Sequence, residues 1–140
     1  MYLHLYHDIT LITTDRVQAK MYPVPIHLKP VFEKEVETLF QQGITQRSNS
    51  PHRSPVVMVW KSDGSYRMAI DYRQLNYITV FQAKPTCSME EDLHKLSGAK
   101  YFSELDICKA YYQVPLSDSA KALTAFPTHL GLMEFCRLPF

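Results

Sequence analysis

The sequence lacks most of the features that identify the class of a small protein at once. Its three cysteines, Cys87, Cys108 and Cys136, are odd in number and widely spaced, and they match no metal-ligand pattern. This excludes a disulfide or zinc framework, and we expect buried or free thiols in a reducing compartment. Fifteen Lys and Arg residues face fourteen Asp and Glu residues, so the net charge of +1 implies no special partner.

Long apolar runs, a leader and internal repeats are lacking as well. The longest apolar run beyond the first residues is 55–60, which is far too short to cross a membrane. Residues 1–14 are apolar, but His4, His7 and Asp8 interrupt them and no basic lead precedes them, so they do not make a signal peptide. We therefore expect a soluble intracellular protein, cytoplasmic or nuclear, that is not secreted and has no membrane partner.

The sequence does have a globular composition with unevenly distributed charge. Its 140 residues are 46% hydrophobic and 12% aromatic, which predicts one domain, or a piece of one, with a real core. Basic residues dominate 43–73, whereas acidic residues dominate 85–106. Two such halves suit a polyanion held next to a metal site, and they suit two ordinary solvated faces equally well.

Two amphipathic helices are predicted. The first has Pro30 in its first turn and Gly43 as its C-terminal cap. The second begins with a capping box of Ser88 and Glu91, and the acids of its first turn are explained by the helix dipole. The faces expected to be buried are Phe32, Val36, Leu39 and Phe40 in the first helix, and Met89, Leu93 and Leu96 in the second.

Strands account for most of the remaining apolar pattern. Residues 55–61 and 66–71 predict a hairpin around an Asp-Gly turn. Residues 77–87 are typical of a long loop, and 120–127 and 131–138 predict two further strands.

One more strand is predicted at 101–107, and Asp106 lies at its end. Asp106 shares a strand face with Phe102 and Glu104. Metal-binding acids often sit at such strand ends, but Asp is also common there because its side chain starts a turn. Similarly, Lys61 and Arg67 flank the predicted hairpin either as functional cations or as charges that protect a sheet edge.

A set of short segments gives a more specific indication than any single residue. Its members include SNSP at 48–51, SPVV at 54–57, KSDGS at 61–65, DYRQLN at 71–76, GAKYFS at 98–103, LD at 105–106, AY at 110–111, QVP at 113–115, TAF at 124–126 and GLMEF at 131–135. They occur in the order and spacing of reverse transcriptases, and so many ordered matches are very improbable by chance. Over residues 22–140 the sequence resembles the polymerases of gypsy-type long-terminal-repeat retrotransposons.

The resemblance implies a catalytic role for Asp106. Asp106 would be the first catalytic carboxylate of a polymerase and would bind two Mg²⁺ ions, with the backbone carbonyl of Ile107 as a further metal ligand. Lys61 and Arg67 match cations that hold the triphosphate of an incoming nucleotide, and Arg suits bidentate phosphate contacts.

The resemblance also implies roles for four further residues. Ala110 and Tyr111 match the nucleotide-binding segment, in which the aromatic residue lies beneath the sugar and excludes a 2′-hydroxyl. Asp71 and Arg73 would lie near the template strand. Deoxynucleotides and an RNA or DNA template-primer are the ligands that this implies.

The sequence also departs from the family. It has no Asp-Asp pair, which the family carries in a later Tyr-x-Asp-Asp hairpin. One carboxylate cannot fix two Mg²⁺ ions, because Mg²⁺ needs near-octahedral geometry and several ligands. Leu123 replaces a common Lys, and Lys84-Pro85-Thr86 replaces a Pro-x-Pro linker. These differences suggest a drifted or partial copy.

We therefore predict an α+β chain that comprises the fingers and a partial palm of a right-hand polymerase, with antiparallel sheets and packed helices. Residues 1–21 would be an N-terminal extension, 22–84 the fingers region and 85–140 a truncated palm region. The parent would be an RNA-directed DNA polymerase, and the isolated chain is predicted to be inactive without the remaining polyprotein. The alternatives are a retained, non-catalytic nucleic-acid-binding remnant and a product without function whose open strands aggregate.

Overall fold

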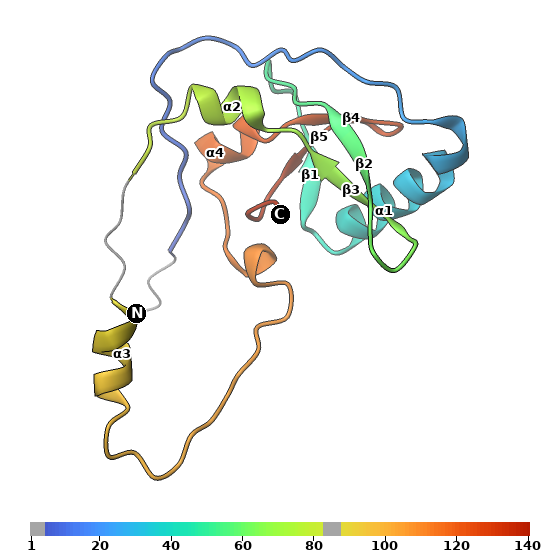
Figure 1. The fold of residues 1–140 in the computed structure, drawn as a ribbon. Coiled ribbons are helices and arrows are strands. Elements are labelled where there is room, and N and C mark those ends of the chain that lie inside the picture. The colour runs from blue at the N-terminus through green and yellow to red at the C-terminus, as the bar shows by residue number, and fades with distance from the viewer. Residues whose placement is uncertain (1–4, 83–87) are drawn as a thin grey trace.

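The computed structural model describes residues 5–82 and 88–140, in which helices pack against antiparallel strands (Figure 1). Its strands form a three-stranded sheet in the order β1-β5-β4 and a separate two-stranded sheet, β2-β3. The predicted α+β class is confirmed. The elements are the 3₁₀ turn η1 (Ile26–Leu28), α1 (Lys29–Gln41), β1 (Thr45–Arg47), β2 (Val56–Trp60), β3 (Tyr66–Ile70), α2 (Arg73–Tyr77), α3 (Met89–Lys95), the 3₁₀ turn η2 (Ala110–Gln113), α4 (Asp118–Leu123), β4 (Phe126–Thr128) and β5 (Gly131–Phe135).

Helix α1 confirms the first predicted helix and packs its apolar face into the core. Pro30 lies in its first turn, where its missing N–H removes no intrahelical hydrogen bond. Gly43 follows the helix with a φ of 65°, a left-handed conformation that costs glycine little. Phe40 was expected on the buried face but is 42% exposed, because it lies at the edge of the apolar stripe. The residues of α1 that are buried are Phe32, Val36 and Leu39.

The three-stranded sheet and α1 enclose the main core. The middle strand, β5, pairs antiparallel with both neighbours, placing Thr45 opposite Phe135 and Phe126 opposite Met133. Phe126 and Met133 are completely buried, and the rings of Phe126 and Phe135 lie 5.1 Å apart between centroids. Apolar burial of this kind is the main source of stability in a small domain.

The hairpin of β2 and β3 confirms the predicted pair of strands. Its register sets Val59 opposite Arg67 and Trp60 opposite Tyr66. The rings of Trp60 and Tyr66 meet edge to face at 4.8 Å, a cross-strand contact that stabilises the open end of the hairpin. Gly64 in the turn has a φ of 81°, which accounts for the Asp-Gly sequence.

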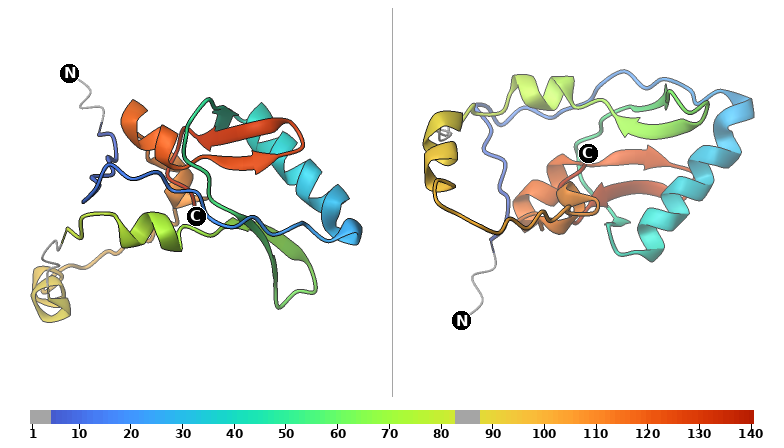
Figure 2. Two further views of the ribbon diagram at one scale, coloured as in Figure 1. Left: turned by 90° about the horizontal axis from the view of Figure 1, so that it is seen from above. Right: turned by 60° about the horizontal axis from the view of Figure 1, so that its bottom comes forward.

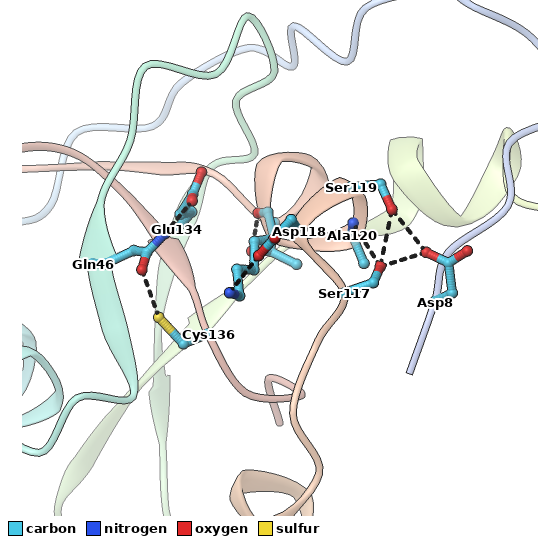
Figure 3. A network of polar contacts seen from close by, with 10 residues as sticks. Asp8, Gln46, Ser117, Asp118, Ser119, Ala120, Glu134 and Cys136 are labelled. Carbon is cyan, nitrogen blue, oxygen red and sulfur yellow. Dashed lines mark hydrogen bonds and ion pairs between the residues drawn. The ribbon is translucent and has the colours of Figure 1, made fainter. Parts of the chain in front are cut away.

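Residues 5–22, which we call the N-terminal arm, run from the side of the molecule that holds α2 and α4 toward α1 (Figure 2). The backbone N–H of Ile12 donates to the carbonyl of Ile78 just after α2. Nearer its start, the carboxylate of Asp8 accepts hydrogen bonds from the hydroxyls of Ser117 at 2.5 Å and Ser119 at 3.0 Å (Figure 3). The arm therefore ties the α2 region to the beginning of α4.

Residues 16–20 of the arm are held in an extended conformation by the segment before β2. The N–H of Arg53 donates to the carbonyl of Val17 at 2.8 Å, and the N–H of Ala19 donates to the carbonyl of Arg53 at 3.3 Å. The N–H of Val17 donates to Nδ1 of His52 at 3.1 Å. Val17 is buried against Leu75 of α2, so the arm covers a second, smaller core.

Acid is expected to loosen this part of the arm. Nδ1 of His52 can accept from Val17 only while the imidazole is neutral, and burial, followed by the charge of Arg16, lowers the pKa of His52 below its ordinary value. The folded state thus binds fewer protons than the unfolded state as pH falls below about 6.5, and stability is lost there. We expect the hydrogen-exchange protection factor of the Val17 amide to fall between about pH 8 and about pH 5.5.

A matched variant separates this effect from general acid sensitivity. In His52→Asn, the side-chain oxygen can still accept from Val17 but does not titrate in this range. The protection of Val17 should then change no more than that of the Met133 amide in β5. An equal acid effect in both proteins would show that His52 is not the responsible group.

Residues 101–107 do not form the predicted strand. They have no regular secondary structure, and Tyr101 and Leu105 are 94% and 89% exposed. A strand is stabilised by hydrogen bonds to a neighbour, and no described strand lies beside this segment. The alternating sequence pattern of 101–107 predicts a strand, but the segment has no neighbouring strand among the described residues with which to pair.

Helix α3 confirms that Ser88 caps the helix, which is one half of the predicted capping box, but it does not confirm the predicted burial. The Ser88 hydroxyl accepts from the N–H of Glu91 at 3.2 Å. The expected buried face is nevertheless open, with Met89 79% exposed and Leu93 61% exposed. In Figures 1 and 2 this helix and the segment after it extend away from the rest of the chain, which explains the exposure.

The strand predicted at 120–127 is wrong in its first half. Residues 118–123 form α4 because the Ser117 hydroxyl accepts from the N–H of Ala120 at 3.2 Å and caps the helix. The strand begins only at Phe126, and its partner ends at Phe135 rather than Leu138. The local cap thus outweighs the strand propensity of the apolar residues.

Two sequence predictions lie outside the described residues: the state of Cys87 and the boundary between 84 and 85. The other two cysteines, Cys108 and Cys136, are free, as predicted. No helix in 5–82 or 88–140 is long and apolar enough to cross a membrane.

Candidate functional site

In the turn of the β2–β3 hairpin, Lys61 forms an ion pair with the carboxylate of Asp63. Nζ of Lys61 lies 3.1 Å from Oδ2 of Asp63, and the two side chains are 42% and 60% exposed. Oδ1 of Asp63 accepts from the hydroxyl and the N–H of Ser65, and these hydrogen bonds, more than Lys61, lower the pKa of Asp63 to about 2. The ion pair between Lys61 and Asp63 at the hairpin tip is weak because solvent screens it. An anionic ligand can therefore take the place of Asp63 beside the Lys61 ammonium.

Arg67 of β3 and Tyr111 of η2 meet around the ring of Phe140. The guanidinium carbon of Arg67 lies 5.2 Å from the centroid of the Phe140 ring, and the rings of Tyr111 and Phe140 meet edge to face at 5.1 Å. A cation above an aromatic face is attracted by the ring quadrupole. The sequence separates these residues widely, so the fold alone brings them together.

These residues line a cavity of about 200 Å³. Lys109 adds a second cation to its wall, and Glu35 of α1 adds a carboxylate. Burial, followed by the negative charge of Glu35, raises the pKa of Tyr112, which also faces the cavity and stays protonated at neutral pH. The cavity thus combines cations with aromatic rings, which suits an anionic ligand that carries a flat or cyclic group.

The backbone at Lys109 aims η2 at this cavity. Lys109 has a φ of 48°, and among the described residues no other non-glycine has a positive φ. A left-handed residue of this type costs about 1 kcal/mol or more, and such strain tends to occur at functional positions. Ala110 directly follows it and begins η2, so the turn at Lys109 sets the direction of Tyr111.

Asp106 and Ile107 lie just before this turn and are exposed. The carboxylate of Asp106 makes no hydrogen bond or ion pair with the part of the chain that the structure describes. No three His, Cys, Asp or Glu side chains within 5–82 and 88–140 lie close enough to hold a metal ion. The described residues therefore do not form a Mg²⁺ site by themselves.

Asp71 and Arg73 form a tight pair at the start of α2. Nη2 of Arg73 donates to Oδ2 of Asp71 at 2.6 Å, and Nε donates to Oδ1 at 2.9 Å. The Asp71 side chain is 15% exposed and the Arg73 side chain is 85% exposed. The largely buried Asp71 therefore anchors Arg73, whose side chain is mostly open to solvent. Hydrogen bonding to Arg73 lowers the pKa of Asp71, which stays ionised at neutral pH.

The structure thus separates the predicted site residues into four places. Arg67 and Tyr111 share the cavity, and Lys61 lies at the hairpin tip. Asp71 and Arg73 lie beside the N-terminal arm, whereas Asp106 and Ile107 lie in the exposed segment before η2. Sequence reasoning missed the other cavity residues. The strained backbone of Lys109 and the position of Glu35 on α1 left no recognisable signal in the sequence. Those missed residues are Glu35, Met68, Lys109, Tyr112 and Phe140.

The helices and antiparallel sheets define an α+β protein, and sequence comparison specifies its family. Residues 59–140, more than half of the chain, match the family described as reverse transcriptase (RNA-dependent DNA polymerase). The chain belongs to the reverse transcriptase family.

Individual relatives confirm the resemblance to gypsy-type retrotransposons. The chain is 36% identical over 138 residues to the retrovirus-related Pol polyprotein from transposon opus of Drosophila melanogaster, covering 95% of this chain and 14% of that protein. It is 33% identical over 138 residues to the corresponding polyprotein from transposon gypsy of the same species, covering 94% of this chain and 13% of that protein. The chain therefore spans about one seventh of the length of such relatives.

A solved structure confirms the fold. The foamy viral protease-reverse transcriptase in complex with an RNA/DNA hybrid superimposes with a TM-score of 0.77 at 25% identity, covering 96% of this chain and 18% of that chain. The described helices and antiparallel sheets thus correspond to part of a polymerase.

Proposed function

We propose that the chain is the fingers and partial palm of an RNA-directed DNA polymerase and works as part of a longer Pol polyprotein. The observation that carries this proposal is the convergence of Arg67 and Tyr111 on one cavity, within the region that matches the family model. Two residues that the resemblance assigns to one nucleotide thus line the same cavity.

In this proposal, the cavity and the hairpin bind the incoming deoxynucleotide. Arg67 and Lys61 contact the triphosphate, because guanidinium and ammonium groups pair well with phosphate oxygens. Tyr111, directed by Ala110 and the turn before it, lies beneath the sugar and disfavours a 2′-hydroxyl. Because Arg67 also lies over the Phe140 ring, it reaches the phosphate from a pre-positioned conformation.

Asp106 supplies a catalytic carboxylate in the same proposal, and the carbonyl of Ile107 lies next to it. The family resemblance implies Mg²⁺ as the cofactor. Because the described residues supply too few ligands, a Mg²⁺ site at Asp106 requires carboxylates from elsewhere in the polyprotein. For this reason we expect the 140-residue chain alone to be inactive. We also propose that the polyprotein works inside the cell.

The proposed partner is a template-primer held near Asp71 and Arg73. Support comes from the foamy viral relatives, whose structures were determined with double-stranded DNA and with an RNA/DNA hybrid. The proposed division into an extension at 1–21, fingers at 22–84 and palm at 85–140 places Asp71 and Arg73 in the fingers.

A non-catalytic nucleic-acid-binding role is the second candidate, favoured by the exposed cations of the hairpin and by Arg73. The two candidates differ in chemistry. Template-directed primer extension tests the first, and Asp106→Asn is the substitution that assigns the activity to this site. Salt-dependent template binding, without extension in any longer form of the protein, would support the second.

A further inference from the structure

Residues 114–117 join two walls of the cavity that we assign to the nucleotide. They directly follow η2, and the N–H of Val114 donates to the carbonyl of Tyr111 at 3.1 Å. They also pair with the chain that leads to Phe140, because the N–H of Leu138 donates to the carbonyl of Val114 at 2.9 Å. The rings of Tyr111 and Phe140 line the cavity. Their relative position therefore depends on how firmly residues 114–117 are held.

The N-terminal arm holds the other edge of residues 114–117. The N–H of His7 donates to the carbonyl of Pro115 at 2.8 Å, and the N–H of Ser117 donates to the carbonyl of His7 at 3.0 Å. Residues 114–117 are thus hydrogen-bonded to the arm along one edge and to the chain that leads to Phe140 along the other. A displacement of the arm can therefore be transmitted to the cavity through this segment.

Asp8 fastens the contact between the arm and residues 114–117. Its Oδ1 atom accepts hydrogen bonds from the hydroxyls of Ser117 and Ser119 (Figure 3). These hydrogen bonds, with that of Ser117 the larger cause, lower the pKa of Asp8, so the acceptor is ionised at neutral pH. Hydrogen bonds to a charged acceptor are roughly twice as strong as neutral ones. The Ser117 hydroxyl also accepts from the N–H of Ala120, so the same contact supports the start of α4.

We propose that Asp8 is a positioning residue for nucleotide binding. By accepting from the two serine hydroxyls it fixes residues 114–117, and these residues keep Tyr111 and Phe140 at the spacing that the nucleotide requires. Asp8 does not line the cavity, so it acts through the backbone rather than on the ligand. A cavity that is held open in its binding geometry loses less free energy to ordering when the ligand binds. This inference rests on the proposed function, which assigns the cavity to a deoxynucleotide.

Amide hydrogen exchange of the 140-residue chain tests the backbone link. Asp8→Ala should speed exchange of the Ser117 amide, which bonds to the arm, and of the Leu138 amide, which does not, by about tenfold each. The Met133 amide in β5 should change less than about twofold, because truncation of an exposed side chain has little effect on overall stability. Faster exchange at Leu138 is the signature of transmission across residues 114–117.

Two variants separate the hydrogen bonds of Asp8 from the loss of a charge. Asp15→Ala removes a carboxylate from the same arm, where Asp15 is exposed and accepts from the hydroxyl of Thr13, two residues away. It should leave exchange at Ser117 and Leu138 within about twofold of the parent. Asp8→Asn keeps an oxygen that can accept from the serines and should retain most of the protection at both amides.

Nucleotide kinetics test the consequence for the cavity. The measurement uses the chain joined to the C-terminal polymerase sequence of the transposon opus relative. Asp8→Ala should raise the KM for deoxynucleotide about fivefold with kcat changed less than about twofold, because binding and not chemistry is affected. Loss of a negative charge would by itself strengthen binding of an anionic triphosphate, so a raised KM reports a change of geometry. Asp8→Asn and Asp15→Ala should both keep a KM within about twofold of the parent.

Three outcomes would overturn the role of Asp8. The first is unchanged exchange at Leu138 in Asp8→Ala, which would confine the effect to the arm. The second is equal acceleration at Met133, which would indicate general destabilisation. The third is an unchanged KM in a joined protein that does extend primers, and this result would leave the polymerase proposal intact. If the joined parent protein incorporates no deoxynucleotide at all, the polymerase proposal fails, and the role of Asp8 fails with it.

Discussion

Asp106→Asn is expected to abolish template-directed DNA synthesis. Because the 140-residue chain alone should be inactive, the measurement uses a chimera in which it is joined to the C-terminal polymerase sequence of the transposon opus relative. The substitution preserves the shape of the side chain and removes its negative charge. We expect primer extension on an RNA template with Mg²⁺ and deoxynucleotides to fall about 10³-fold or more, equivalent to about 4 kcal/mol of barrier.

The exposure of Asp106 makes this loss interpretable. Its carboxylate has no hydrogen-bond or ion-pair partner in 5–82 or 88–140, so the substitution removes no stabilising contact there. Thermal unfolding of the variant should therefore match that of the unsubstituted chimera. A large loss of activity without a loss of stability assigns a chemical role to the carboxylate.

Glu104→Gln is the matched control. Glu104 lies two residues away in the same exposed segment and also loses one negative charge on substitution. Its activity should stay within about threefold of the parent chimera, because only local charge at the reacting centre matters strongly. Equal losses in the two variants would indicate general electrostatics, and retained synthesis in Asp106→Asn would refute the catalytic assignment.

The unextended chain provides the complementary result. Neither it nor its Asp106→Asn variant should extend a primer. If the unextended chain extended a primer and its Asp106→Asn variant did not, our proposal that the chain alone is inactive would be contradicted. It would then be necessary to find the missing acids in a second copy of the chain.

Local features of the fold were predictable from the sequence because short-range chemistry decides them. Asp63 and Gly64 satisfy the backbone geometry of the hairpin turn, and Ser88 satisfies a free N–H at the start of α3. These interactions span three residues or fewer. Their presence in the structure therefore depends little on the remainder of the chain.

The failures have a common cause in tertiary context. The strand predicted at 101–107 and the buried face predicted for α3 both depend on packing partners that the described residues do not provide. A periodic pattern records which face a segment can bury, but it does not supply the surface that covers it. The apolar side chains of 89–107, among them Met89, Leu93 and Tyr101, are therefore exposed among the described residues.

In the candidate site too, the sequence predicted individual residues but not their tertiary contacts. The family resemblance selected Arg67 and Tyr111, but only the fold showed that both contact Phe140. Periodicity gave no indication of the path of the N-terminal arm, because residues 16–20 form an irregular segment whose conformation depends on hydrogen bonds to Arg53. Contacts between residues far apart in the sequence were therefore the part that sequence reasoning could not predict.

Phe126→Ala is expected to cause the largest loss of stability. Phe126 is completely buried between α1 and the three-stranded sheet and packs against the ring of Phe135. Truncation of a buried phenylalanine costs about 3–5 kcal/mol, because apolar contacts are lost and a cavity remains. This is a large share of the total for a small domain, which is about 5–15 kcal/mol. Urea unfolding followed by circular dichroism should show a much lower midpoint or no folded baseline.

Phe102→Ala makes the same chemical change on a surface that the described chain leaves open. Phe102 lies in the 101–107 segment and is 69% exposed, so its truncation should change the free energy of unfolding by about 0.5 kcal/mol or less. Comparable losses in the two variants would mean that 101–107 packs against the core in solution, as the sequence pattern predicts. A selective loss in Phe126→Ala would show instead that the fold stands on the α1–β5 core without the segment that carries Asp106.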